Sequence, residues 1–299
     1  SSFEKLRKKL QLNDIVNMAH LGPRAFEEIG GEVVQTTSFV IRKSHIEGYK
    51  GTYCRLIEPT TQQGKEEMFL ACENRYYAEQ ENFAKIPGSP VAYWVSSQVR
   101  DAFANNPLIE DILETRNGMS TTNNNLFLKM WFEPSKEKCG LGSFTAVSAK
   151  NSLKKWFRYN KGGEFRRWYG NNDYIVNWEN DGEELKKYVS ERYGSYSKEI
   201  RSEDRYFYES ITWSGVTSSQ TGFRFSFQGA IFDSGANGLF ADETRILKYT
   251  LGFLNTKLVV NFVKCKNPTI NTGSGTIGKL PICIQNDKIQ VVNNIVDEC

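Results

Sequence analysis

The sequence lacks any run of apolar residues near the roughly 20 needed to span a bilayer, and its first residues lack the charged-then-apolar order of a secretion signal. It has only two histidines, and its six cysteines include no Cys-x-x-Cys pair. These absences argue against a membrane span, a zinc site and a disulfide framework, and they favour buried free thiols. We therefore expect a soluble, cytoplasmic protein without a metal or membrane partner.

Motifs for small-molecule catalysis are also missing. The glycine-rich stretch at 273–278 lacks the Lys-Ser/Thr ending and the strand-then-helix setting of a phosphate loop. His20 and His45 are far apart in the sequence, and the acidic pairs lie on polar segments, as solvated residues do. A general acid–base pair therefore cannot be argued from spacing.

Aromatic residues are abundant instead: the 299 residues include 19 Phe, 14 Tyr and 6 Trp. This composition predicts a folded body, either one large domain or two ordinary ones. The chain begins without methionine and stops in an amphipathic segment, so we expect both ends to continue into a longer protein.

Composition divides the chain into four parts. Residues 1–57 combine a predicted helix, from the spacing of Phe3, Leu6, Leu10 and Ile15, with two predicted strands at 31–41 and 51–57 that form a hairpin. Residues 58–90 are predicted to be a connecting segment with one or two helices, closed by two prolines. Residues 91–281 alternate short strands with helices at 183–192 and 244–255, and residues 282–299 begin a further helical segment. The fold class predicted is α/β (α+β).

The most informative segment lies between Lys150 and Asp173, where seven cations face two carboxylates. Its net charge is +5, whereas the whole chain carries only +3. Cations, aromatic rings and glycines alternate here, as expected of a surface that pairs with phosphates and stacks on bases. A Gly-rich hairpin with a solvated basic face and its aromatic rings in the core explains the same composition equally well.

Several unusual strings follow one another along the chain. They are IPGSPVAYWVS at 86–96, GMSTTNN at 118–124, WFRYNKGG at 156–163, RWYGN at 167–171, ITWS at 211–214, LGFLNTK at 251–257, NPT at 267–269 and LP at 280–281. In this order they resemble the PglX family, the large adenine-specific DNA methyltransferases of bacteriophage-exclusion (BREX) systems. The resemblance covers nearly the whole chain.

This resemblance implies a division of labour. The cofactor-binding glycine motif and the Asn-Pro-Pro-Tyr motif of such enzymes are absent here, so residues 1–57 would be the tail of the catalytic domain and residues 91–281 the target-recognition domain. S-adenosylmethionine would bind the parent enzyme, and this fragment would bind no cofactor. The partners implied are double-stranded DNA, the remainder of the methyltransferase and other phage-defence subunits. Phe26 falls where related enzymes stack a ring on the flipped adenine, although a core phenylalanine is an equally simple interpretation.

Phosphate contacts fix register and a few side chains read base edges. The predicted DNA contacts in the recognition domain are Lys154, Lys155, Arg158, Lys161, Gly162, Gly163, Arg166, Arg167, Trp168, Tyr169, Asn123, Asn124 and Arg224. Several have a structural alternative: Trp168 and Tyr169 as core residues, the asparagines as a loop, and Arg224 as an edge-strand residue whose stem covers apolar surface.

Two functions from different classes remain open on the sequence. The first is the DNA-recognition portion of an adenine-N6 methyltransferase used in phage defence or restriction-modification. The second is a non-catalytic interaction module that binds RNA or a partner subunit, because the small total charge does not demand duplex DNA.

Overall fold

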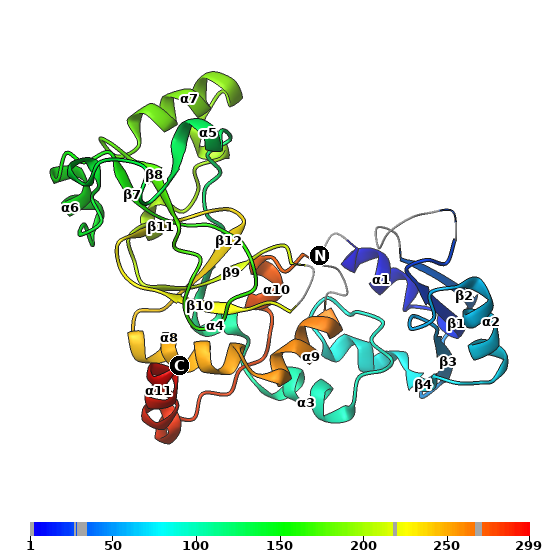
Figure 1. Cartoon of the computed structure of the whole chain (residues 1–299). Helices are drawn as coiled ribbons and strands as arrows, with labels where there is room; N and C mark the ends of the chain where they lie inside the picture. The colour runs from blue at the N-terminus through cyan, green and yellow to red at the C-terminus, as the bar shows by residue number, and fades with distance from the viewer. Residues whose placement is uncertain (1–2, 27, 29–34, 218–219, 267–270) are drawn as a thin grey trace. The chain divides into compact units, whose positions relative to one another are not determined.

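The computed structural model describes residues 3–26, 28, 35–217, 220–266 and 271–299 (Figure 1). The chain forms two compact units, residues 1–105 and 106–299. Both contain helices and mixed sheets, which confirms the α/β fold class. The first residues of the strand predicted at 31–41 and the NPT string at 267–269 lie outside the described residues.

The first unit is built on a four-stranded sheet in the order β2-β1-β3-β4. Strand β1 pairs antiparallel with β2 and parallel with β3, and β4 pairs antiparallel with β3. The unit also contains helices α1, α2 and α3 and the 3-10 helix η1. The bounds are α1 (Glu4–Leu10), β1 (Asp14–Gly22), β2 (Thr36–Arg42), β3 (Lys50–Arg55), α2 (Gln62–Leu70), β4 (Arg75–Glu79), η1 (Gln80–Lys85) and α3 (Ser97–Asn105).

Two sequence predictions for this unit are wrong. Helix α1 ends at Leu10 and buries none of its residues, while Ile15 belongs to strand β1. The strands predicted at 31–41 and 51–57 do not form a hairpin, because β1 lies between β2 and β3. The physical reason is that β-branched Ile15 is 5% exposed and packs with the rings of Tyr53 and Phe83, which a strand places better than a surface helix does.

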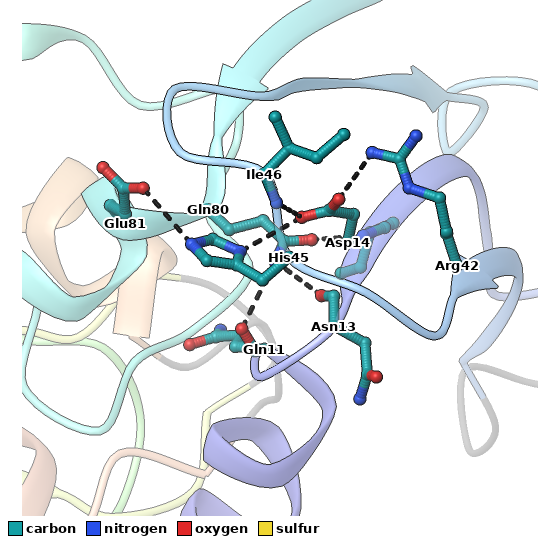
Figure 2. A network of polar contacts seen from close by, with 9 residues as sticks. Gln11, Asn13, Asp14, Arg42, His45, Ile46, Gln80 and Glu81 are labelled. Atoms are coloured by element: carbon teal, nitrogen blue, oxygen red, sulfur yellow. Dashed lines mark hydrogen bonds and ion pairs between the residues drawn. The ribbon is translucent and has the colours of Figure 1, made fainter.

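A polar network joins the start of β1 to the loop after β2 (Figure 2). The buried Asp14 carboxylate accepts hydrogen bonds from Arg42 Nη2 at 2.5 Å, His45 Nδ1 at 3.1 Å and Ile46 N at 3.3 Å. Burial alone would raise the pKa of Asp14, but these hydrogen bonds and the charge of Arg42 leave the pKa below its usual value. Gln80 joins the network's other side by donating to Asn13 O at 2.8 Å. We assign the network a structural role.

The second unit contains two four-stranded sheets. One has the order β10-β9-β12-β5 with antiparallel neighbours, and the other has the order β11-β7-β8-β6 with one parallel pair, β11 and β7. The strands are β5 (Glu114–Arg116), β6 (Leu128–Met130), β7 (Trp156–Asn160), β8 (Tyr174–Asn177), β9 (Ser210–Ser214), β10 (Phe223–Ser226), β11 (Ala230–Phe232) and β12 (Ala236–Phe240).

The helices of this unit follow their local signals. Helix α7 runs between Gly182 and Gly194, both left-handed, and buries Leu185 and Val189 at the i, i+4 spacing of one face. Helix α8 buries leucines on the face that packs on β9 and β10, as predicted. The bounds are α4 (Ile109–Ile112), α5 (Asn124–Phe127), η2 (Lys136–Lys138), α6 (Ala146–Asn151), α7 (Glu183–Tyr193), η3 (Tyr196–Lys198), η4 (Glu203–Arg205), α8 (Thr244–Leu254), α9 (Lys257–Lys266), α10 (Ser274–Gly278), η5 (Asn286–Lys288) and α11 (Ile289–Glu298).

One face of the β11-β7-β8-β6 sheet packs into the main core of the second unit. Leu128, Phe157, Val176 and Ile231 are all less than 9% exposed and belong to one apolar cluster. Side chains alternate between the two faces of a strand, so the neighbouring residues of these strands point the other way. Within the described part of the chain, no helix is both long and apolar enough to cross a membrane.

Candidate nucleic-acid interface

The basic segment from Lys150 to Asp173 runs through the end of α6, strand β7 and the loop between β7 and β8, and Trp168 attaches this loop to the edge of the other sheet. Trp168 N donates to Phe223 O at 2.8 Å, and Phe225 N donates to Trp168 O at 2.8 Å. Trp168 adopts a positive φ of 68°, and its ring is half-buried. These two hydrogen bonds fix the loop beside β10, so its cations are held by a folded element and not by a free tail.

Glycines let this loop approach its neighbours closely. A Cβ on Gly222 would collide with Arg166 O, and one on Gly162 would lie 2.6 Å from Gly235 O. Gly163 N donates to Ser214 Oγ at 3.0 Å, and Ser214 Oγ donates back to Gly163 O at 2.9 Å. The Gly163 N–H is therefore already occupied, and the glycine pair serves close packing.

The three lysines predicted as phosphate contacts all have internal partners. Glu184 accepts hydrogen bonds from Asn177 and Lys155, which hold the pKa of its carboxyl below the usual range. A lysine that already faces a carboxylate loses that partner, or shares it, when it moves to a phosphate. The pairs are Lys154 Nζ with Glu137 O at 2.5 Å, Lys155 Nζ with Glu179 at 3.5 Å and Glu184 at 3.2 Å, and Lys161 Nζ with Asp233 at 3.8 Å.

The arginines of the segment, unlike Lys155 and Lys161, have no carboxylate partners among the described residues. Arg158 on β7 and Arg166 in the loop are exposed, and no carboxylate of the described residues lies within ion-pairing distance of either. Arg167 donates to Gln220 Oε1 at 3.1 Å and lies over the Phe165 ring at 5.3 Å. The structure thus separates the predicted cations into paired lysines and available arginines.

Arg224 is not on the surface that the sequence predicted. It is 2% exposed on β10, where its guanidinium makes one long hydrogen bond to the residues that the structure describes, 3.5 Å to Gly222 O. Burial and the nearby charge of Arg166 lower the pKa of Arg224 to about 10. A side chain this deeply enclosed does not reach DNA from the conformation described here.

The asparagine cluster is also a local structural feature. Asn123 caps helix α5 by accepting from Leu126 N at 3.3 Å, and its amide donates to Tyr188 Oη at 3.0 Å. Asn124 accepts a hydrogen bond from Thr121 Oγ1. Both side chains therefore have internal partners, which favours the loop interpretation that the sequence left open.

A hollow of about 250 Å³ lies beside the basic loop, on the sheet face opposite the core. Its floor includes one cross-strand row, because Arg158 on β7 pairs with both Ile175 on β8 and Ala230 on β11. Exposed aromatic rings surround it. The lining residues are Trp131, Leu141, Arg158, Tyr159, Asn160, Tyr169, Asn172, Ile175, Ser226, Phe227 and Ala230.

Of these lining residues, Arg158 and Tyr169 were predicted from the sequence as DNA contacts, whereas Trp131 and Phe227 were not singled out. Trp131 follows β6 and Phe227 follows β10, nearly a hundred residues apart in the chain. The available signal was weak: each is an aromatic residue just beyond a strand, where a buried side chain is not required. Pairing of the strands is what brings them to one hollow.

The hollow is a poor match for the cofactor that the family resemblance implies. Its volume is below the roughly 300–1,000 Å³ of clefts for drug-sized ligands. Arg158 is the one charged side chain that lines it within the described part of the chain, and this cation would repel the sulfonium of S-adenosylmethionine. Among the described residues, no three His, Cys, Asp or Glu side chains gather as a metal site.

In the first unit, Phe26 is 57% exposed. The alternative of a core phenylalanine is therefore not what the structure shows. Residues 29–34, which follow it, lie outside the described part of the chain.

No protein-family model matches the chain. Curated relatives include the adenine-specific methyltransferase PglX of Lacticaseibacillus casei (strain Zhang), 41% identical over 292 residues that make up 95% of this chain and 24% of that protein. The adenine-specific methyltransferase BrxX of Escherichia coli O9:H4 (strain HS) is 36% identical over 296 residues, 97% of this chain and 23% of that protein. The chain thus spans about a quarter of the length of these relatives, and the resemblance seen in its motifs is confirmed.

A similar fold occurs in the Type IIL restriction-modification enzyme MmeI, solved in complex with DNA. The TM-score is 0.51 over 96% of this chain and 38% of that one, at 12% sequence identity. At this identity the likeness concerns the fold alone.

Proposed function

We propose, on the premise that this chain belongs to the PglX family of adenine-specific methyltransferases, that its second unit recognises duplex DNA for a methyltransferase whose chemistry is carried by other parts of the enzyme. The observation that carries the proposal is the surface around the β7–β8 loop, where available arginines adjoin an aromatic hollow. The similar fold of MmeI, which was solved in complex with DNA, supports it.

Phosphate contacts are assigned to Arg158, Arg166 and Arg167. Guanidinium groups hold phosphates in a bidentate manner, and these three lack carboxylate partners among the described residues, so binding DNA costs them no internal ion pair. Lys155 and Lys161 contribute less, because each must leave a carboxylate. Tyr169, exposed beside the arginines, is assigned to contact bases.

The first unit is proposed to be the last part of the methyltransferase sheet, with exposed Phe26 stacking on the flipped adenine. S-adenosylmethionine would bind the remainder of the full-length enzyme. We propose phage defence in the cytoplasm as the use of that enzyme. Phe26→Ala in the intact enzyme should slow methyl transfer more than it weakens DNA binding, whereas equal losses would reject the stacking role.

A salt titration tests DNA recognition. Each phosphate contact contributes about 0.9 to the slope of log affinity against log salt, so Arg166→Gln/Arg167→Gln should lower the slope for a mixed-sequence duplex by about 2. The matched control is Lys187→Gln/Arg192→Gln on α7, which removes the same charge from another element and should change the slope less.

The outcome also separates the two classes of function. If the chain does not bind duplex DNA at low salt but does bind RNA or a protein partner, the result would support the interaction module instead. If both double variants lowered the slope equally, binding would reflect total charge and not this surface. Sequencing of methylated bases in cells with and without the intact enzyme would then report the modified base and its context.

A further inference from the structure

The hollow on the second unit is surrounded by aromatic rings that the fold leaves uncovered. Trp131, Tyr169 and Phe227 are 55%, 61% and 58% exposed, and all three line it. The rings of Tyr169 and Phe227 lie 6.3 Å apart, and Phe227 is held from behind by an edge-to-face contact with Phe225 at 5.0 Å. Large rings gathered around one concave surface are typical of a stacking platform for a planar ligand.

The polar groups of the hollow fit a ligand with hydrogen-bonding edges. Asn160 donates to Ser226 Oγ, which fixes both side chains at the wall. Asn172 is exposed and has no hydrogen-bond partner among the residues that the structure describes. An amide and a hydroxyl beside aromatic faces match the edge and the face of a heteroaromatic ring.

The charge and the volume of the hollow further restrict the kind of ligand that it can bind. Among the described lining residues Arg158 alone is charged, so the hollow favours an anion or an uncharged group attached to one. A volume of about 250 Å³ suits a single planar ring system and not a whole dinucleotide. A nucleobase joined to a phosphate meets all these conditions.

We infer that this hollow receives one unstacked nucleobase of the DNA. The base lies against Trp131, Tyr169 or Phe227 while the adjoining phosphate faces Arg158. Bases within a duplex show only their edges to a protein, so the base must leave the stack, as it does in enzymes that flip bases. The inference rests on the proposed function of the same unit, but it is tested separately.

The experiment compares three duplexes of one mixed sequence: an intact duplex, one with a single extrahelical base, and one with an abasic residue in place of that base. The 299-residue chain should bind the extrahelical base at least about fivefold more tightly than the abasic residue, because stacking distinguishes them. Trp131→Ala/Phe227→Ala should remove this difference between the two modified duplexes.

Tyr208→Ala is the matched control, since Tyr208 is 55% exposed, like Trp131, but lies outside the hollow. The Tyr208→Ala variant should retain the full difference in affinity between the duplex with the extrahelical base and the duplex with the abasic residue. Equal affinity for the two modified duplexes, including none for either, overturns the inference, as does a difference that survives in the double variant. Failure of the proposed DNA recognition shows instead in the intact duplex, which would then not bind at low salt.

Discussion

Replacement of Arg224 by methionine should stabilise the second unit. The guanidinium is buried on β10, has one long hydrogen bond to Gly222 O, and its Nε atom has no partner among the described residues. Methionine keeps an unbranched apolar stem of similar length and removes the charge. A buried ion without good partners costs stability, so an apolar replacement of similar shape is favourable.

The magnitude follows from the lowered pKa. Because burial and then the charge of Arg166 lower the pKa of Arg224 to about 10, the charged form costs the fold about 3 kcal/mol at neutral pH. Loss of the weak hydrogen bond and imperfect packing of methionine offset part of this gain, which leaves about 1–3 kcal/mol. For a domain of this size the melting temperature should rise by roughly 2–12 °C.

Differential scanning calorimetry of the parent chain and Arg224→Met measures this change. Lys187→Met on α7 is the control, because its exposed side chain should shift stability by no more than about 0.5 kcal/mol. A lower melting temperature for Arg224→Met would refute the reasoning, since it would mean that the guanidinium makes stronger contacts than its single long hydrogen bond.

Three further predictions concern other parts of the fold. Asp14→Asn should destabilise the first unit at pH 7. Folding lowers the pKa of the Asp14 carboxyl, so the contribution of this carboxylate to the free energy of unfolding is fully present above the ordinary pKa of 3.8. That contribution is lost as the pH falls through the pKa of the folded state. In urea unfolding, the difference in the free energy of unfolding between the parent chain and Asp14→Asn should be smaller at pH 3 than at pH 7. An equal difference at the two pH values would contradict this. Lys65→Met should cost about 1–3 kcal/mol in the same assay, because Lys65 Nζ donates to Leu21 O and Leu56 O at 2.7 Å, and their loss leaves carbonyls unpaired. Gly222→Ala should displace the loop at Arg166 and weaken duplex binding in a fluorescence titration, whereas unchanged affinity would separate the loop from DNA recognition.

Local signals predicted many elements correctly. Helices α7 and α8 and strand β3 lie within a few residues of the predicted segments, because each has an apolar pattern that its surroundings satisfy. The start of strand β1 was mistaken for a helix, since the helical spacing of Phe3, Leu6 and Leu10 was extended to Ile15, which lies beyond the end of α1. Strand β4 was missed in a polar segment whose pairing with β3 supplies its hydrogen bonds.

The sequence by itself determined the family resemblance, the α/β class and the concentration of positive charge between Lys150 and Asp173. Only the tertiary structure decided which of those cations remain available, because the carboxylates that hold Lys155 and Lys161 come from α7, its preceding turn and the segment after β11. The aromatic hollow likewise depends on strand pairing that joins distant segments. Charge and aromatic content are properties of the chain, whereas proximity in space is fixed by the packing of the whole unit.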